Sequence, residues 1–203
     1  MEETDTYKTI EKSSNETLFK EKGSKFFGYT FPVSNETEVN NALEQVKILH
    51  KSARHFCYAY QLGSESIYYR VNDDGEPSNS AGMPIYGQIQ SFDVTNILIV
   101  VVRYFGGTKL GVGGLISAYK TSAKLALEAS KIVEKTIDIR YEVVFDYQNI
   151  NKVMRIIKEK NLDVVNQQLE VDCKIWLSIR KSKAKEVEKL FESIYEVNIH
   201  QIN

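Results

Sequence analysis

The sequence predicts an α+β protein of two domains, with the division after residue 132. Within residues 1–132, strand-like and helix-like segments surround a wholly apolar run, Ile97–Val102, long enough for one fully buried strand. Residues 133–203 contain segments in the order βαββαβ, which is the split-βαβ or ferredoxin-like order. No Gly/Ser-rich linker separates the two parts, so we expect the domains to pack with limited freedom.

In the first domain, apolar and alternating segments predict strands at 7–10, 16–19, 25–33, 55–62, 66–71 and 96–104. The short connection 21–24 predicts a hairpin between the second and third strands. Helical spacing of apolar residues predicts helices at 36–51, from 81 or 83 to 90, and at 113–130. The last of these contains many small residues, which would let it lie close against a sheet.

In the second domain the same patterns predict strands at 135–145, 162–169, 172–180 and 196–199. Helices are predicted at 147–160 and 182–194, each with apolar residues on one face.

The composition is that of a soluble globular protein, with 42% hydrophobic residues and a net charge of −1, which argues against a wholly basic nucleic-acid coat. No apolar run approaches the length of a membrane span, and the acidic, polar N-terminus is unlike a secretory signal. Cys57 and Cys173 each lie in an apolar segment and are interpreted as buried free thiols of a reducing compartment. We therefore expect a cytoplasmic protein with no membrane partner.

A glycine-rich loop follows the buried strand and leads directly into a helix. Such a loop is a good anion-binding geometry, because backbone amides at a helix start point toward the ligand. Charged residues from 83 to 131 are mostly basic. Neither the P-loop nor the dinucleotide fingerprint is present. The glycines could instead only permit a tight crossover beneath a close-packed helix. The candidate residues for binding an anion or nucleic acid are Arg103, Tyr104, Phe105, Gly106, Gly107, Lys109, Gly111, Gly113 and Gly114.

An acidic segment, Asp73–Pro77, allows three interpretations. Its carboxylates could hold a hard cation or act as an acid/base pair. They could belong to a simple β-turn, for which Asp and Gly are suited. They could also pair with Arg103 and brace the glycine loop. The candidate catalytic residues are His55, Asp74, Glu76 and Ser78.

A histidine on a strand, such as His55, is more often structural than catalytic. The sequence has no EF-hand loop, no G-x-S-x-G elbow and no H-E-x-x-H helix. We expect neither a metal site nor a cofactor.

Three segments together resemble the YigZ/IMPACT family, as a bacterial two-domain member: ARHFCYAY at 53–60, DDGEPSNSAGMPI at 73–85 and VVVRYFGGTKLGVGGLISAY at 100–119. The resemblance implies the fold of ribosomal protein S5 domain 2, an α/β sandwich, for the first domain. It implies a ferredoxin-like second domain similar to an elongation factor C-terminal domain. Eukaryotic members regulate translation through a kinase-activating partner, whereas the biochemistry of bacterial members is poorly defined.

The chain departs from the usual family pattern at several positions. Asn79, Ser80 and Met83 stand where EPSGTAG followed by Lys or Arg is usual. In and after the glycine loop, Val112 replaces Thr and Ser117 replaces a common Arg. The loss of two basic residues weakens the electrostatic case for tight phosphate binding.

The leading hypothesis is a non-enzymatic, cytoplasmic regulatory or binding protein linked to translation, which contacts RNA or the ribosome through the glycine-rich surface. In this hypothesis Arg103 and Lys109 bind phosphate, and Tyr104 or Phe105 stacks on a base. One alternative is an enzyme that acts on a small phosphorylated or carboxylated ligand through Asp74 and Glu76. Another is a protein-interaction module that docks a translation-related partner on the helical face of the second domain.

Overall fold

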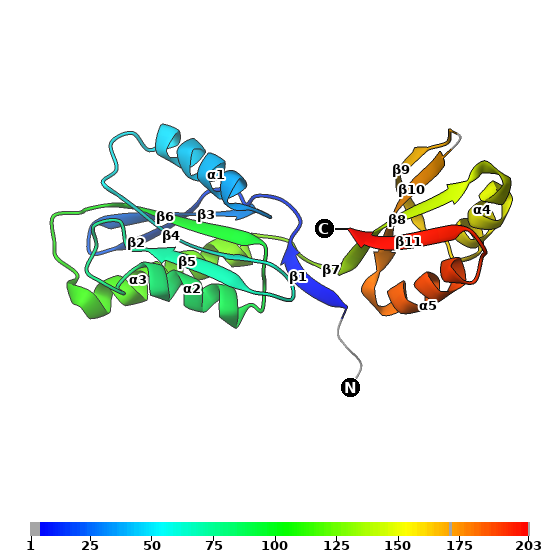
Figure 1. Ribbon diagram of the computed structural model, residues 1–203. Helices are drawn as coiled ribbons and strands as arrows, with labels where there is room; N and C mark the ends of the chain where they lie inside the picture. Colours follow the sequence, from blue (N-terminus) through cyan, green and yellow to red (C-terminus); the bar gives the residue numbers. More distant parts are fainter. Residues whose placement is uncertain (1–4, 171, 203) are drawn as a thin grey trace. The chain divides into compact units, whose positions relative to one another are not determined.

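A computed structural model of the chain describes residues 5–170 and 172–202. These residues form two compact units, one of residues 7–135 and one of residues 136–202 that also takes in residues 5–6 (Figure 1). The boundary lies three residues beyond the predicted one. The difference arises because β7 (Ile132–Thr136) continues across residue 132 and pairs with β1 (Thr6–Ile10) in a two-stranded sheet.

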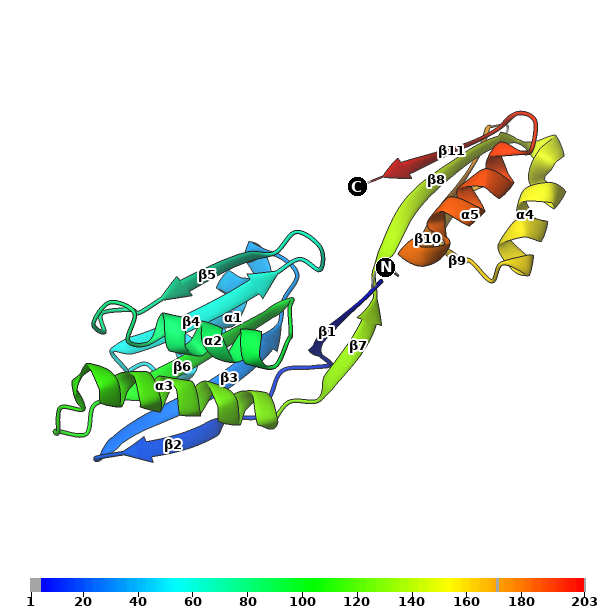
Figure 2. The ribbon, with the colours of Figure 1, turned by 90° about the horizontal axis from the view of Figure 1, so that it is seen from below.

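The first unit is built on a five-stranded sheet in the order β2-β3-β6-β4-β5, in which all neighbours are antiparallel. The strands are β2 (Thr17–Glu21), β3 (Ser24–Pro32), β4 (His55–Leu62), β5 (Tyr68–Asn72) and β6 (Ile97–Tyr104). Helix α1 (Glu36–Leu49) covers one face, and α2 (Gly82–Ser91) and α3 (Gly111–Glu128) cover the other (Figure 2). The result is a helix–sheet–helix sandwich.

The central strand β6 explains why its sequence is a continuous apolar run. Ile97, Ile99 and Val101 pack with α2 and α3, while Leu98, Val100 and Val102 pack with α1. All six side chains are fully buried. A strand with a helix layer on each face has no solvent side, so alternation is lost from its sequence.

Successive side chains of β6 point to opposite faces of the sheet up to the end of the strand, where the candidate site lies. Arg103 lies opposite His55 in β4 and Phe26 in β3, on the face that α2 and α3 cover. Tyr104 therefore points to the α1 face, and the residues that follow leave the sheet.

The second unit has a four-stranded antiparallel sheet in the order β11-β8-β10-β9. Its strands are β8 (Asp138–Asp146), β9 (Asp163–Gln168), β10 (Asp172–Arg180) and β11 (Val197–Ile202). Helices α4 (Ile150–Glu159) and α5 (Lys181–Glu192) pack on one face, and a short 3₁₀ turn at Tyr147–Asn149 precedes α4. The α+β class and the βαββαβ order are confirmed.

One predicted strand, 135–145, is in fact parts of two strands, β7 and β8, with a break at Ile137. The amide of Ile137 donates to the carbonyl of Asp5 (2.7 Å), and its carbonyl accepts from the amide of Lys181 (2.8 Å). These partners lie far away in the sequence, so no local pattern marks the break.

Candidate functional site

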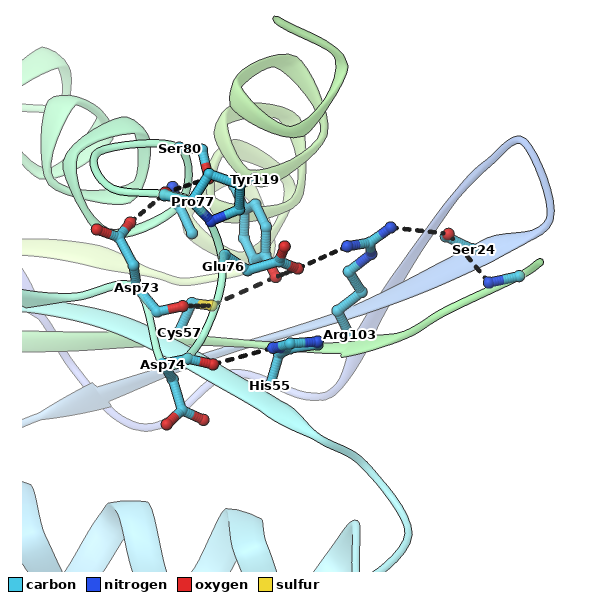
Figure 3. Close-up of polar contacts among 12 residues, drawn as sticks. Ser24, His55, Cys57, Asp73, Asp74, Glu76, Pro77, Ser80, Arg103 and Tyr119 are labelled. Carbon is cyan, nitrogen blue, oxygen red and sulfur yellow. Dashed lines mark hydrogen bonds and ion pairs between the residues drawn. The ribbon is translucent and has the colours of Figure 1, made fainter. Parts of the chain in front are cut away.

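The candidate site lies at the end of the first unit's sheet where β6 ends (Figure 3). The acidic segment between β5 and α2 lies beside the first residues of β4 and the last residues of β6, and Tyr119 of α3 points toward it. Thus the three motifs singled out in the sequence come together in space.

Glu76 and Arg103 form the centre of this arrangement. Nη1 of Arg103 donates to Oε1 of Glu76 at 2.7 Å, and the side chains are 6% and 5% exposed. The hydroxyl of Tyr119 donates to the same carboxylate oxygen at 2.8 Å. Nη2 of Arg103 is 3.4 Å from the hydroxyl of Ser24, which also accepts from the amide of Gly106 at 3.2 Å. The bracing interpretation is therefore confirmed for Glu76.

The expectation that Arg103 binds phosphate from solvent requires a correction. Its guanidinium is buried, and the carboxylate of Glu76 already offsets its charge. The rings of Phe26 and Phe105 further enclose it, at 5.6 and 5.5 Å from Cζ. The positive field at the loop must come from other residues.

Asp73 organises the start of helix α2. Its Oδ1 accepts the amides of Ala81 (2.9 Å) and Gly82 (2.8 Å), and its Oδ2 accepts the amide of Asn79 (2.8 Å). A carboxylate at this place satisfies amides that have no partner within the helix and lies favourably in the helix dipole. Asp73 is thus structural.

Asp74 points away from Glu76 and is also committed to backbone partners (Figure 3). Its Oδ2 accepts the amide of Phe56 at 2.7 Å, and its carbonyl accepts from Nδ1 of His55 at 2.9 Å. Ser78 is exposed. The four candidate catalytic residues therefore do not form a nucleophile–base pair or a shared acid/base site. Among the described residues, no cluster of three or more His, Cys, Asp or Glu is placed to hold a metal ion.

Cys57 lies behind the brace in the core. Its Sγ is 3.0 Å from the carbonyl oxygen of Asp73 and 3.3 Å from the hydroxyl of Tyr119. Burial raises the pKa of Cys57 and of Tyr119, so both remain protonated at neutral pH. The prediction that Cys57 and Cys173 are buried and free is confirmed.

Tyr104 belongs to a different polar chain, on the α1 face. Its hydroxyl is 3.1 Å from Nδ1 of His50, whose Nε2 is 2.5 Å from the hydroxyl of Tyr29. Tyr29 in turn donates to the carboxylate of Glu16. Tyr104 is therefore held by its own side-chain partners, whereas Phe105 is 56% exposed. Of the two aromatic residues expected near a ligand, Phe105 is the one presented to solvent.

The glycines of the loop serve two different purposes. A Cβ on Gly106 would lie 1.9 Å from the carbonyl carbon of Gly23, so this position requires close backbone contact with the β2–β3 hairpin. Gly107 and Gly111 have φ of 89° and 72°, which glycine adopts readily, and open space surrounds their Cβ positions. Gly113 is likewise open. Close packing is therefore required at Gly106, against the hairpin and not beneath a helix as expected, and the other three glycines leave exposed backbone.

Helix α3 begins at this exposed backbone without a side-chain cap. No acidic residue lies in its first turn, and Lys109 before it is exposed. Gly23 in the hairpin lies against Gly106 of the loop, which brings the adjacent Lys22 close to it, and Lys25 lies opposite Tyr104 in the sheet. Sequence reasoning missed Ser24, Lys22 and Lys25 because their proximity depends on strand pairing.

The profile of the Impact N-terminal domain matches residues 22–127, which contain the whole of this site. The chain belongs to the IMPACT family. It is similar to "IMPACT family member YvyE" of Bacillus subtilis (strain 168), with 34% identity over 76% of this chain and 70% of that one. "IMPACT family member YigZ" of Escherichia coli (strain K12) is 30% identical over 71% of this chain and 72% of that protein.

A crystal structure described only as that of a hypothetical protein matches the IMPACT chain over 98% of both chains, with 25% identity and a TM-score of 0.75. The two-unit fold is therefore shared along the whole length. None of the helices in the described residues is long and apolar enough to cross a membrane.

Proposed function

We propose that this IMPACT family member is a non-enzymatic regulatory protein linked to translation, and that it contacts RNA, free or on the ribosome, through the glycine loop (Phe105–Gly114). The link to translation rests on the family, whose eukaryotic members the resemblance identifies as translational regulators. The chemistry of the contact is argued from the loop itself.

The observation that carries the proposal is the exposed backbone of the loop at an uncapped helix start. The first amides of a helix have no partner within it, and the helix dipole favours an anion there. Without side chains at Gly107, Gly111 and Gly113, a phosphate group can approach the backbone closely.

The loop is also held in place, which lowers the entropic cost of binding. Ser24 connects the amide of Gly106 to the buried Arg103–Glu76 pair. The brace thus gives Arg103 an indirect role as a support for the loop. The positive charge facing RNA comes from Lys109 together with Lys22 and Lys25, all three exposed.

Binding of the wild-type chain to RNA tests this proposal. The measurement is fluorescence anisotropy with a labelled single-stranded RNA and with a hairpin RNA, plus co-sedimentation with ribosomes, across a series of salt concentrations. We expect affinity to fall steeply as salt rises, because each neutralised phosphate releases counterions. Undetectable binding to all three targets, or binding independent of salt, would overturn the proposal.

The enzyme alternative finds no comparable support. Asp73, Asp74 and Glu76 are each engaged in contacts that hold the fold, and Glu76 is buried against Arg103. Docking on the second unit's helical face stays a prediction.

A further inference from the structure

A cleft of about 330 Å³ lies beside the glycine loop, and its volume is within the range of small-molecule sites. It is lined by Ser52, Ala53, Arg54, His55, Arg103, Tyr104 and Phe105. The cleft forms where the segment entering β4 faces the segment leaving β6. His55 and Arg103 are direct partners across these strands.

The lining favours a negatively charged ligand. The lining residues include Arg54, His55 and Arg103 and no acidic residue, although Glu76 behind the cleft already offsets the charge of Arg103. Arg54 lines the cleft and carries an exposed positive charge. The Nδ1 atom of His55 is used by the carbonyl of Asp74, which fixes the ring's orientation.

Arg103 lines the cleft but does not supply the phosphate contact. Its Nη1 and Nη2 are bonded to Glu76 and Ser24, and the rings of Phe26 and Phe105 enclose the guanidinium. The accessible positive charge at the cleft therefore comes from Arg54, with His55 next to it, and a phosphate group is an anion that such a charge binds.

Two aromatic residues complete the lining. Tyr104 is fixed through its hydroxyl by His50, so one wall is rigid. Phe105 is 56% exposed, and its ring lies over the guanidinium of Arg103, with 5.5 Å from its centroid to Cζ. An exposed ring beside cationic groups is the combination that binds a base and its phosphate.

We infer that this cleft binds a single phosphorylated nucleotide, with the phosphate at Arg54 and His55 and the base against Phe105. The inference rests on the proposed function, because it names the unit of RNA held beside the loop. The same chemistry is offered by a free nucleotide and by the phosphorylated end of an RNA strand.

Isothermal titration of the full chain with AMP, adenosine and inorganic phosphate tests the inference. We expect AMP to bind more tightly than either fragment. Arg54→Ala should weaken AMP binding about tenfold, as expected for loss of one charge-assisted contact. Phe105→Leu should weaken AMP and adenosine but leave inorganic phosphate unchanged. Absence of AMP binding at about 1 mM, or equal AMP affinity in wild type and Arg54→Ala, would overturn the inference.

Two further experiments are needed. One distinguishes an RNA end from a free nucleotide as the ligand, and the other distinguishes failure of this inference from failure of the proposed function. Preference for 5′-phosphorylated over 5′-hydroxyl oligoadenylate would assign the cleft to an RNA end, and preference for AMP over both would assign it to a free nucleotide. Lys120→Ala should leave AMP affinity unchanged, because Lys120 does not line the cleft. RNA binding that depends on Lys109 without AMP binding would refute this inference alone. AMP binding without RNA or ribosome binding would refute the proposed function alone.

Discussion

Glu76 and Arg103 come from segments 27 positions apart and meet as a buried ion pair, 2.7 Å between Oε1 and Nη1. The pair joins the acidic segment to the end of the central strand, and through Ser24 it reaches the glycine loop. The acidic segment and the glycine loop, which look like separate functional motifs in the sequence, are thus linked through one set of contacts.

Breaking this pair should be costly for folding. Glu76→Gln leaves the guanidinium of Arg103 buried without its counter-charge, so we expect the free energy of unfolding to fall by about 3 to 5 kcal/mol. Urea denaturation measures the change. The control is the double variant Glu76→Leu/Arg103→Met, which replaces both charges with apolar groups and should recover most of the loss. A single variant as stable as wild type would exclude the brace.

The buried His50 should make stability fall on mild acidification. Burial lowers the pKa of His50 below its usual 6.5, while the charge of Glu16 opposes this shift. Between the two pKa values the unfolded chain binds a proton at His50 that the folded chain does not. The contribution of neutral, buried His50 to folding stability is therefore fully present above pH 6.5 and is lost as the pH falls through the folded pKa. Thermal melts of wild type and His50→Gln between about pH 7.5 and 5.5 test this, and the variant should show the flatter pH dependence.

The glycines of the loop should differ sharply in their tolerance of alanine. Gly106→Ala forces a methyl group against the backbone of Gly23, so it should destabilise the unit or displace the hairpin. Gly113→Ala meets no atom within 4 Å and lies inside helix α3, where alanine is favoured by up to about 1 kcal/mol. Comparison of their unfolding free energies checks this contrast; similar losses at both positions would refute it.

Both cysteines should be inert in the folded protein. Burial raises the pKa of Cys57 and Cys173, and their side chains are fully buried, so little reactive thiolate is available. Labelling with a thiol reagent at neutral pH should be slow for the native chain and rapid for two thiols in denaturant. Fast labelling without denaturant would contradict the structure at these positions.

Periodicity predicted most of the architecture because the elements follow local rules. The run Ile97–Val102 predicted a fully buried strand, and the βαββαβ order in the second unit followed from the spacing of apolar residues. The strand β7 was missed because its pairing with β1 joins residues from opposite ends of the first unit.

The three motifs of the candidate site come together in the structure, but Arg103 is buried against Glu76 instead of being open to phosphate from solvent. A single arginine before a glycine loop carries no signal of whether a carboxylate will bury it. Three acidic residues in four positions allowed the bracing role, yet only packing decides that Glu76 turns inward while Asp74 turns to the amide of Phe56. The cleft beside Arg54 depends on strand register, which no motif in the sequence marks.

The most direct test of the account compares the salt dependence of RNA binding for wild type, Lys109→Ala and the control Lys120→Ala, whose lysine lies further along helix α3. If the glycine loop contacts phosphate directly, Lys109→Ala should lower the slope of log affinity against log salt by about 0.7 to 0.9, the value for one phosphate contact. Lys120→Ala should leave the slope near that of wild type. Equal slopes for wild type and Lys109→Ala would contradict direct contact between the loop and RNA.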